Sequence, residues 1–359
     1  MSPFDEPKDD GPAEAGESRR RAANQPKPIC LALQGGGAHG AFTWGVIDKI
    51  LEDGSLSIEA VSGTSAGAMN AAVLADGFAR GGAEMARTRL REFWQSISEH
   101  GWFHSLMRTP ISHLRGDWSL DDSPGYIAFD LLSRMLSPYD LNPLNVNPLL
   151  SLIEETIDFE MVRQCTAFRL FISATNVETG RVRVFEKEEL TAQMVMASAC
   201  LPHLFQAVEI DGVPYWDGGY MGNPALWPFF DTCYTNDIVI VQINPLVRQG
   251  APKTAQEIMN RLNEITFNAS LQRELRAIDF VSRLIEDGRL DSERYRHVLV
   301  HRIHSDEMCH LTASSKLNAE WAFIEHLFDL GRRSAEGWLD RHCDQIGHES
   351  TVDIRALFD

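Results

Sequence analysis

The feature that most constrains the fold of this chain is an alternation of strand and helix patterns over residues 28–79. The run PICLALQ at 28–34 and the run IEAVSG at 58–63 are apolar enough to be buried strands. Glycines follow each run, and apolar or small residues at helical spacing come next. Two such strands joined through a helix lie parallel, with a right-handed crossover. The segment therefore predicts an α/β fold with a mainly parallel sheet.

The rest of the chain continues this alternation. Further strand patterns lie at 168–176, 181–185, 207–219, 237–244 and 296–303. Further helix patterns lie at 65–79, 85–98, 188–200, 251–290 and 314–341. Few boundary signals interrupt the series, so we expect one domain over 28–345, between a disordered N-terminal tail (1–27) and a C-terminal tail (346–359).

Residues 99–150 interrupt the alternation. They are rich in aromatic residues and leucines, are broken by prolines, and contain no strand pattern. We expect an inserted cap of short helices and loops. Two interpretations stay open for this insert: a lid that contacts lipid, or ordinary packing over the core.

Composition limits the partners and the compartment. The net charge of −18 repels phosphate polyanions, which disfavours nucleic acid as a partner. Contact with a membrane surface would be transient and would use apolar side chains or a local basic patch such as 19–21. The six cysteines form no C-x-x-C pair, and no signal peptide or bilayer-spanning run is visible. We expect a cytoplasmic location, and export without a signal stays open.

The segment Gly63-Thr64-Ser65-Ala66-Gly67 matches G-x-S-x-G where a predicted strand meets a predicted helix. In such an elbow a sharp turn exposes the serine hydroxyl beside the N-terminus of a helix. The flanking Gly63 and Gly67 are required because side chains there would collide with the adjoining strand and helix. The pattern indicates that Ser65 is a nucleophile.

The loop after the first strand allows two interpretations. Its glycines at 35, 37 and 40 have the G-x-G-x-x-G spacing of a dinucleotide site, which needs an acidic residue at the end of the second strand. Glu59 instead stands at the start of that strand. In the second interpretation the loop offers backbone N–H groups to an oxyanion near Ser65. The donors would be Gly35, Gly36, Gly37 and Ala38.

Asp217, followed by Gly218 and Gly219, is the candidate base. Alone, Asp-Gly-Gly is typical of a turn, but with an elbow serine upstream the carboxylate can serve as a proton acceptor. A histidine triad is disfavoured, because the later histidines at 297, 301 and 304 lie in a strand pattern or at its end, and His310 follows it. We expect neither a metal nor a cofactor.

These three motifs, in this order and spacing, resemble the patatin-like phospholipases. The stretches SATNVETGRVRVF and ASACLPHLFQAVEIDGVPYWDGG are also similar to that family, and the likeness extends over about 28–340. It implies a three-layer α/β/α fold and a catalytic dyad in which Ser65 attacks an ester carbonyl and Asp217 takes its proton.

The resemblance also implies that the glycine loop is the oxyanion hole and that the substrate is a lipid acyl ester. The chain would then be a serine carboxylic-ester hydrolase of the phospholipase A or lysophospholipase type. A lipid-binding protein of this fold without catalysis is the alternative, and a dinucleotide-dependent oxidoreductase is less favoured.

One residue departs from the family. Relatives often carry arginine or lysine where this chain has His39, which is neutral unless it is protonated. Either His39 orders the glycine loop less firmly, or it is a helix-start residue that faces solvent. We do not assign it as the general base.

Overall fold

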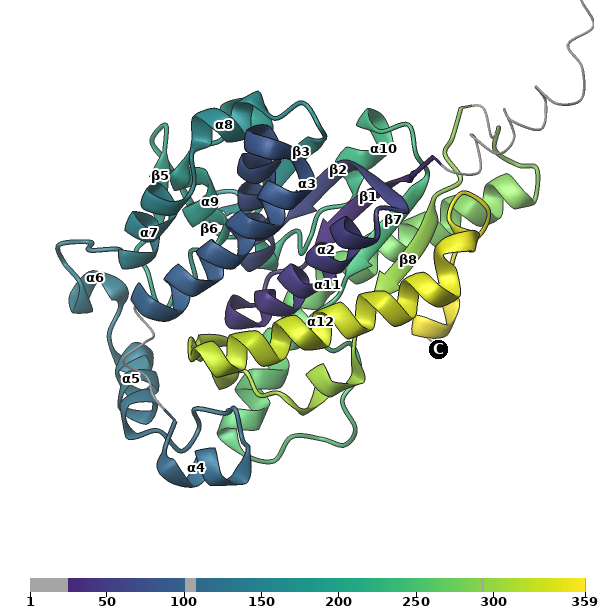
Figure 1. Cartoon of the computed structure of the whole chain (residues 1–359). Helices are drawn as coiled ribbons and strands as arrows, with labels where there is room; N and C mark the ends of the chain where they lie inside the picture. The colour runs from purple at the N-terminus through teal and green to yellow at the C-terminus, as the bar shows by residue number, and fades with distance from the viewer. Residues whose placement is uncertain (1–24, 101–107, 292–293, 359) are drawn as a thin grey trace, which may run out of the picture.

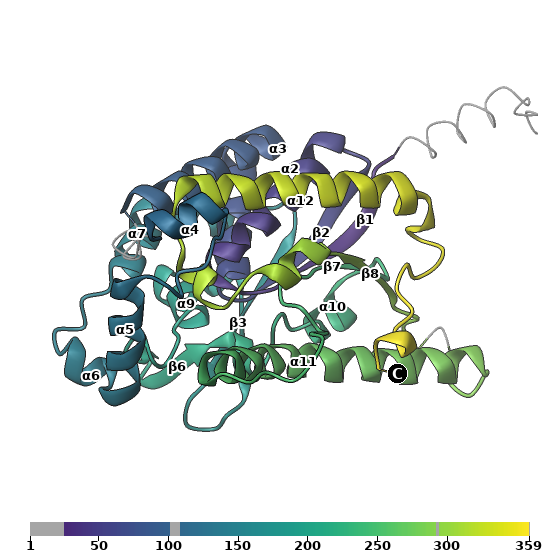
Figure 2. The same ribbon diagram turned by 90° about the horizontal axis from the view of Figure 1, so that it is seen from below.

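The computed structural model describes residues 25–100, 108–291 and 294–358, and it shows three layers. A central sheet lies between two sets of helices (Figures 1 and 2). One face is covered by α2 (Gly40–Asp53), α3 (Ala66–His100) and α12 (Trp321–His342). The other face is covered by α10 (Trp227–Thr232) and α11 (Ala255–Glu286). The predicted α/β/α architecture is confirmed.

The central sheet has eight strands and is mainly parallel. The strands are β1 (Lys27–Leu33), β2 (Leu56–Gly63), β3 (Arg169–Asn176), β4 (Val182–Glu186), β5 (Val208–Ile210), β6 (Val213–Asp217), β7 (Asp237–Val241) and β8 (Leu299–Ile303). Their order is β5-β6-β3-β2-β1-β7-β8, and β4 also pairs with β3. The pairs β3–β2, β2–β1, β1–β7 and β7–β8 are parallel, whereas β4, β5 and β6 join antiparallel.

Strand β1 shows why these runs are apolar throughout. Ile29, Leu31 and Leu33 pack toward α2, α3 and α12, while Cys30 and Ala32 pack toward α10 and α11. A parallel strand covered on both faces needs apolar residues at every position. Burying each large side chain contributes about 1.5–3 kcal/mol, so the layers on both faces hold the central strands in place.

The observed helices differ from the predicted ones mainly at their ends. The helices predicted at 65–79 and 85–98 form one element, α3, with a kink at Gly81 and Gly82. The helix predicted at 188–200 is shorter, because Thr191 caps α9 (Ala192–Ser198) by accepting from the Met194 N–H. The segment predicted as one helix at 314–341 divides into a short 3-10 turn, η6 (Ser314–Leu317), and then α12.

Residues 99–100 of the predicted insert belong to the end of α3, and the rest of its described part, 108–150, contains helices and loops and no strand, as expected. Its helices are α4 (Pro110–Arg115), α5 (Pro124–Met135), α6 (Pro138–Leu141) and α7 (Pro148–Thr156). Each begins with a proline, whose missing N–H costs nothing at the first helical position. Four prolines that break the sequence pattern therefore start helices, whereas Pro143 lies in a turn. Residues 101–107 of the predicted insert lie outside the described residues.

The remaining short elements connect these layers. They are η1 (Gly37–His39), α8 (Phe159–Gln164), η3 (Lys187–Glu189), η4 (Gly218–Tyr220), η5 (Asp306–His310), η7 (Cys343–Gln345) and η8 (Arg355–Leu357).

The structure describes the predicted C-terminal tail up to residue 358 but only the last three residues of the predicted N-terminal tail. Residues 1–24 of the predicted N-terminal tail lie outside the described residues. The last segment packs along β8, where the Ser350 hydroxyl accepts from the Val300 N–H, and Leu357 contacts the apolar core. The domain boundaries at 28–345 stay predictions.

Candidate active site

Ser65 lies in the turn between β2 and α3, with only 8% of its surface exposed. Its φ of 55° is in the left-handed region, which a residue with a side chain adopts only where the surroundings enforce it. One such constraint is that the start of α3 packs closely against the end of β1: a Cβ added at Gly67 would collide with the Leu33 backbone. The turn therefore directs the Ser65 side chain away from the sheet.

The Ser65 backbone is anchored by a residue that the motifs did not identify. Its N–H donates to the Ser198 hydroxyl at 2.9 Å, and that hydroxyl donates to the Ser173 carbonyl at 2.6 Å. Ser198 is the last residue of α9, far from Ser65 in the sequence. No spacing rule connects the two, so only the packing of α9 against the sheet could reveal this contact.

The glycine loop lies directly beside Ser65. Leu33 and Gly63 are partners in the parallel β1–β2 ladder, so the segments that follow them leave the sheet together. A Cβ on Gly35 would come 2.7 Å from the Ser65 Cβ, and only glycine allows this approach. The structure thus brings the two predicted motifs together.

The four predicted oxyanion donors are not equivalent. The Gly35 N–H already donates to Asn223 Oδ1 at 2.7 Å. Among the described residues, no group accepts from the N–H of Gly36, Gly37 or Ala38, because these residues form the open N-terminal end of η1. Those three N–H groups are therefore the ones available to a ligand.

Amide side chains hold the loop in this position. Asn244 Nδ2 donates to the Gly35 carbonyl at 2.7 Å. Gln34 Oε1 accepts from the backbone N–H groups of Ile243 and Asn244, at 3.0 and 2.9 Å. These contacts join the end of β1 to the loop after β7. Isolated asparagines and glutamines carry no recognisable motif, so sequence reasoning missed them.

Asp217 ends β6 and is 1% exposed. β3 pairs with β2 along its first half and with β6 at its end, so the end of β6 comes close to the turn that carries Ser65. Asp217 Oδ1 accepts from the Gly219 N–H at 2.7 Å. No full hydrogen bond from a described residue reaches the buried Oδ2. The Ser65 hydroxyl nevertheless lies close enough to act on the carboxylate.

The surroundings of Asp217 raise its pKa to about 7. Burial is the main cause, because a carboxylate out of water is disfavoured as an anion. The Gly219 N–H, the Ser65 hydroxyl and the charge of Lys316 lower the pKa and partly oppose this effect. A carboxylate that titrates near neutral pH is a far better proton acceptor than an aspartate in water.

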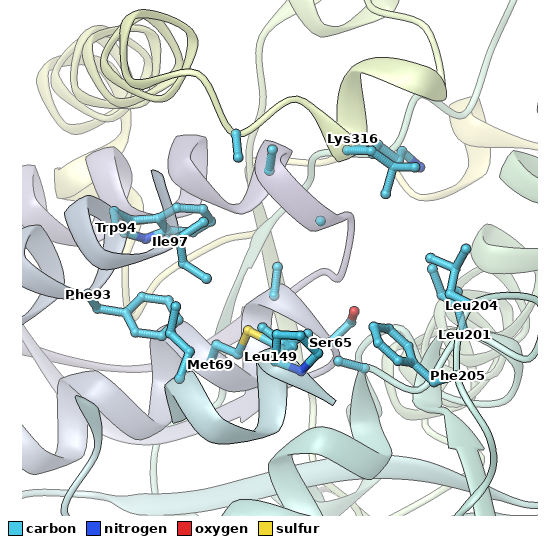
Figure 3. A pocket seen from close by; sticks show the side chains of 18 residues that line it. Ser65, Met69, Phe93, Trp94, Ile97, Leu149, Leu201, Leu204, Phe205 and Lys316 are labelled. Carbon is cyan, nitrogen blue, oxygen red and sulfur yellow. The ribbon is translucent and has the colours of Figure 1, made fainter. Parts of the chain in front are cut away.

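Ser65 opens into an apolar cavity of about 110 Å³. Its hydroxyl points into this space, with Trp94 and Ile97 on one side and Phe205 on the other (Figure 3). The cavity is lined by Gly37, Ala38, Ser65, Ala66, Met69, Phe93, Trp94, Ile97, Pro148, Leu149, Leu152, Ala199, Leu201, Leu204, Phe205, Lys316, Leu317 and Ala319. Helix α7 of the insert thus forms one wall.

His39 does not face solvent, so that interpretation is wrong. It is 3% exposed, and its Nε2 lies 2.8 Å from the Ser315 hydroxyl. That hydroxyl donates to the Thr312 carbonyl, which leaves it to accept from the Nε2–H of a neutral ring. Burial, together with the charges of Lys316 and Arg248, lowers the pKa of His39 well below its usual value.

The other histidines and Glu59 lie elsewhere. None of His297, His301, His304 and His310 lines the cavity. His301 is buried and pairs with Asp237 at 2.9 Å. Glu59 lies in the middle of β2 and accepts from the backbone N–H groups of Tyr234 and Thr235, so its carboxylate is engaged there and is not placed to bind a ribose.

Three further observations concern the described residues alone. They contain no group of three or more His, Cys, Asp or Glu side chains placed to bind a metal ion. None of their helices is both long enough and apolar enough to span a bilayer. The six cysteines are free thiols, and four of them are buried.

Comparison with known proteins bears on this geometry. A family model described as patatin-like phospholipase matches residues 31–230, which contain Ser65, Asp217 and the glycine loop. Among curated proteins, no match was found.

Solved structures give remote similarities. The crystal structure of VipD from Legionella pneumophila is 17% identical, over 86% of this chain and 67% of that chain, with a TM-score of 0.32. The crystal structure of the type III effector protein ExoU is 16% identical, over 89% of this chain and 54% of that chain, with a TM-score of 0.35. The structure of the ExoU–SpcU complex of Pseudomonas aeruginosa is 20% identical, over 93% of this chain and 66% of that chain, with a TM-score of 0.31. The chain thus spans about half to two thirds of these proteins.

Proposed function

The chain belongs to the patatin-like phospholipase family, and from this premise we propose that it hydrolyses acyl esters of lipids with a Ser65–Asp217 dyad. The family supports lipid acyl hydrolysis as the reaction class. The assignment of the individual residues is our proposal, and it rests on the geometry of the cavity.

In this proposal the Ser65 hydroxyl attacks the ester carbonyl and Asp217 takes the hydroxyl proton. The carbonyl oxygen becomes an oxyanion and receives hydrogen bonds from the N–H groups of Gly36, Gly37 and Ala38. One such donor is worth about 10²–10³ in rate. Asp217 then returns the proton to the leaving alcohol, and an acyl group stays on Ser65. Asp217 then takes a proton from water as the water oxygen attacks the acyl-enzyme carbonyl. The bond to the Ser65 oxygen breaks, Asp217 gives the proton to that oxygen, and the fatty acid is released.

A single observation supports this proposal more than any other. The strained Ser65 turn presents a hydroxyl to a buried carboxylate that has one oxygen without a full hydrogen bond and a pKa near 7. A structural aspartate is normally satisfied by hydrogen bonds and keeps a low pKa, because an unpartnered buried carboxylate is costly. Such a cost is expected where the group accepts a proton during a reaction.

The test is covalent labelling with a fluorophosphonate probe, which reacts with activated serines. We expect the wild-type protein and the matched control Ser151→Ala, an exposed serine on α7, to be labelled. Ser65→Ala should not be labelled. Absence of labelling in folded wild-type protein would refute the hydrolase and favour a lipid-binding role, whereas labelling of Ser65→Ala would refute the site.

We also propose that the insert contacts the lipid surface from which the substrate comes. The region from α5 to the start of α7 exposes Ile127, Leu131, Leu132, Met135, Leu136, Tyr139, Leu141, Leu144 and Val146. This apolar surface adjoins the cavity wall, since Gln206, next to Phe205, donates to the Asn142 carbonyl at 2.7 Å. Apolar contact suits a chain of net charge −18 better than attraction to anionic lipid.

A further inference from the structure

Among the described residues that line the cavity beside Ser65, Lys316 is the single charged one. It comes from η6, which lies outside the segment matched by the family model. Its ammonium donates to Asn244 Oδ1 at 2.7 Å. Within the described residues, no carboxylate forms an ion pair with it. A cation in this position needs an explanation, because burial of an unpaired charge is costly.

Of the two carboxylates that act on Lys316, Glu264 and Asp217, only Asp217 lacks an ion pair with an arginine or lysine among the described residues. Burial lowers the pKa of Lys316, as does the charge of Arg248, while Glu264 and Asp217 raise it. Glu264 is already paired with Arg248 and Arg261, at 2.6 and 3.1 Å. Asp217 has no cationic partner at ion-pair distance among the described residues. The charge of Lys316 therefore acts on the Asp217 carboxylate without a second cation bound to that carboxylate.

The segment that carries Lys316 also holds the glycine loop. The Lys316 carbonyl lies directly over Gly37, where an added Cβ would collide with it. Next to it, the Ser315 hydroxyl binds His39. Asn244, which accepts from the Lys316 ammonium, donates to the Gly35 carbonyl. The ammonium is thus placed by the same contacts that place the oxyanion donors.

The loop itself supplies no positive charge, because His39 is buried and neutral. We propose that Lys316 is the cation of this active site: held by Asn244 above the glycine loop, it favours the anionic form of Asp217 and the oxyanion that develops beside Ser65. Lys316 is then a positioning residue that acts through its field, without bonding to the substrate. The inference rests on the proposed function.

The test measures the pH dependence of kcat/KM with a soluble short-chain ester. Lys316→Met removes the charge and keeps the apolar stem, Lys316→Arg keeps the charge, and Lys253→Met is the control at an exposed lysine. Without the cation the pKa of Asp217 rises, so the acid limb of the profile should move to higher pH by up to about one unit. Below that limb this shift should lower kcat/KM of the Lys316→Met protein by up to about tenfold. Lys316→Arg and the control should keep the wild-type limb.

An unchanged acid limb in folded Lys316→Met protein would overturn the inference, whether or not its activity falls. If Lys316→Met does not fold, as judged by near-ultraviolet circular dichroism, Lys316→Gln provides the same comparison with a neutral group that can still donate to Asn244. The proposed function fails separately: it fails if the wild-type protein is neither labelled by a fluorophosphonate nor active. An active, labelled wild type with an unshifted variant refutes only the role of Lys316.

Discussion

Replacing Asp217 with asparagine is expected to abolish most turnover and, above neutral pH, to stabilise the folded protein. Burial raises the pKa of Asp217 from 3.8 to about 7. Between these pH values the folded protein holds a proton that the unfolded chain has released. The free energy of unfolding therefore falls as pH rises from 3.8 to 7 and stays at its lower value above pH 7. Asparagine cannot ionise, so the variant does not carry this cost.

The size of the effect follows from the pKa. A shift of about 3 units corresponds to about 4 kcal/mol above pH 7. Asparagine at 217 can still accept from the Gly219 N–H, but its amide nitrogen would replace the oxygen that lacks a full partner. An unsatisfied buried N–H costs about 1–3 kcal/mol at every pH. We therefore expect a net gain of about 1–3 kcal/mol at pH 8.

The change of the stability difference with pH is the sharper measurement. The cost of the unsatisfied asparagine amide is the same at every pH, so it does not contribute to that change. The stability difference between Asp217→Asn and wild type should grow by about 3 kcal/mol from pH 5 to pH 8. Urea unfolding at pH 5, 6, 7 and 8 measures this difference, with Asp211→Asn in the exposed turn before β6 as the control. A difference that is the same at pH 5 and pH 8 would refute the reasoning that burial penalises the Asp217 carboxylate.

Three further outcomes are expected. The kcat/KM of the wild-type protein should fall about tenfold per pH unit on the acid side of pH 7, since the base must be ionised, and a pH-independent rate between 5 and 8 would exclude Asp217 as base. Gly37→Ala should lower kcat by about 10²–10³, because the added Cβ displaces the oxyanion donors. Gly54→Ala is the control, since Gly54 has a similar φ but open space around it, and it should keep the wild-type kcat. Equal kinetics of the two variants would contradict this role of the glycine loop. Leu131→Ser combined with Met135→Ser should weaken sedimentation with phosphatidylcholine vesicles and leave soluble ester hydrolysis unchanged, and undiminished sedimentation would argue against lipid contact through α5.

Much of the site was predictable because its parts are local. The turn at Ser65 needs Gly63 and Gly67 within a few residues, so their spacing between a predicted strand and a predicted helix indicated an elbow. The strand patterns before each glycine segment were also sufficient to predict that both motifs leave a parallel sheet at the same edge. Strand β1 pairs with β2 in register at Leu33 and Gly63, in agreement with that expectation.

Helix ends and the environment of His39 were less accessible. The helix predicted from 314 begins later, because η6 turns away to cover the glycine loop. The same turn buries His39 against Ser315, which a helical pattern around His39 could not indicate. Both differences come from contact between segments that lie far apart in the chain.

By itself, then, the sequence determined the α/β class, the family and the residues that carry its motifs, because short-range spacing and strand patterning encode these features. Only the tertiary structure decided which N–H groups of the loop are free and that Asn223 accepts from the Gly35 N–H. It also decided that Ser198 anchors the Ser65 backbone and that Lys316 lines the cavity. The pKa of Asp217 belongs to this second class. Burial and neighbouring dipoles raise or lower a pKa, and both depend on how distant segments pack.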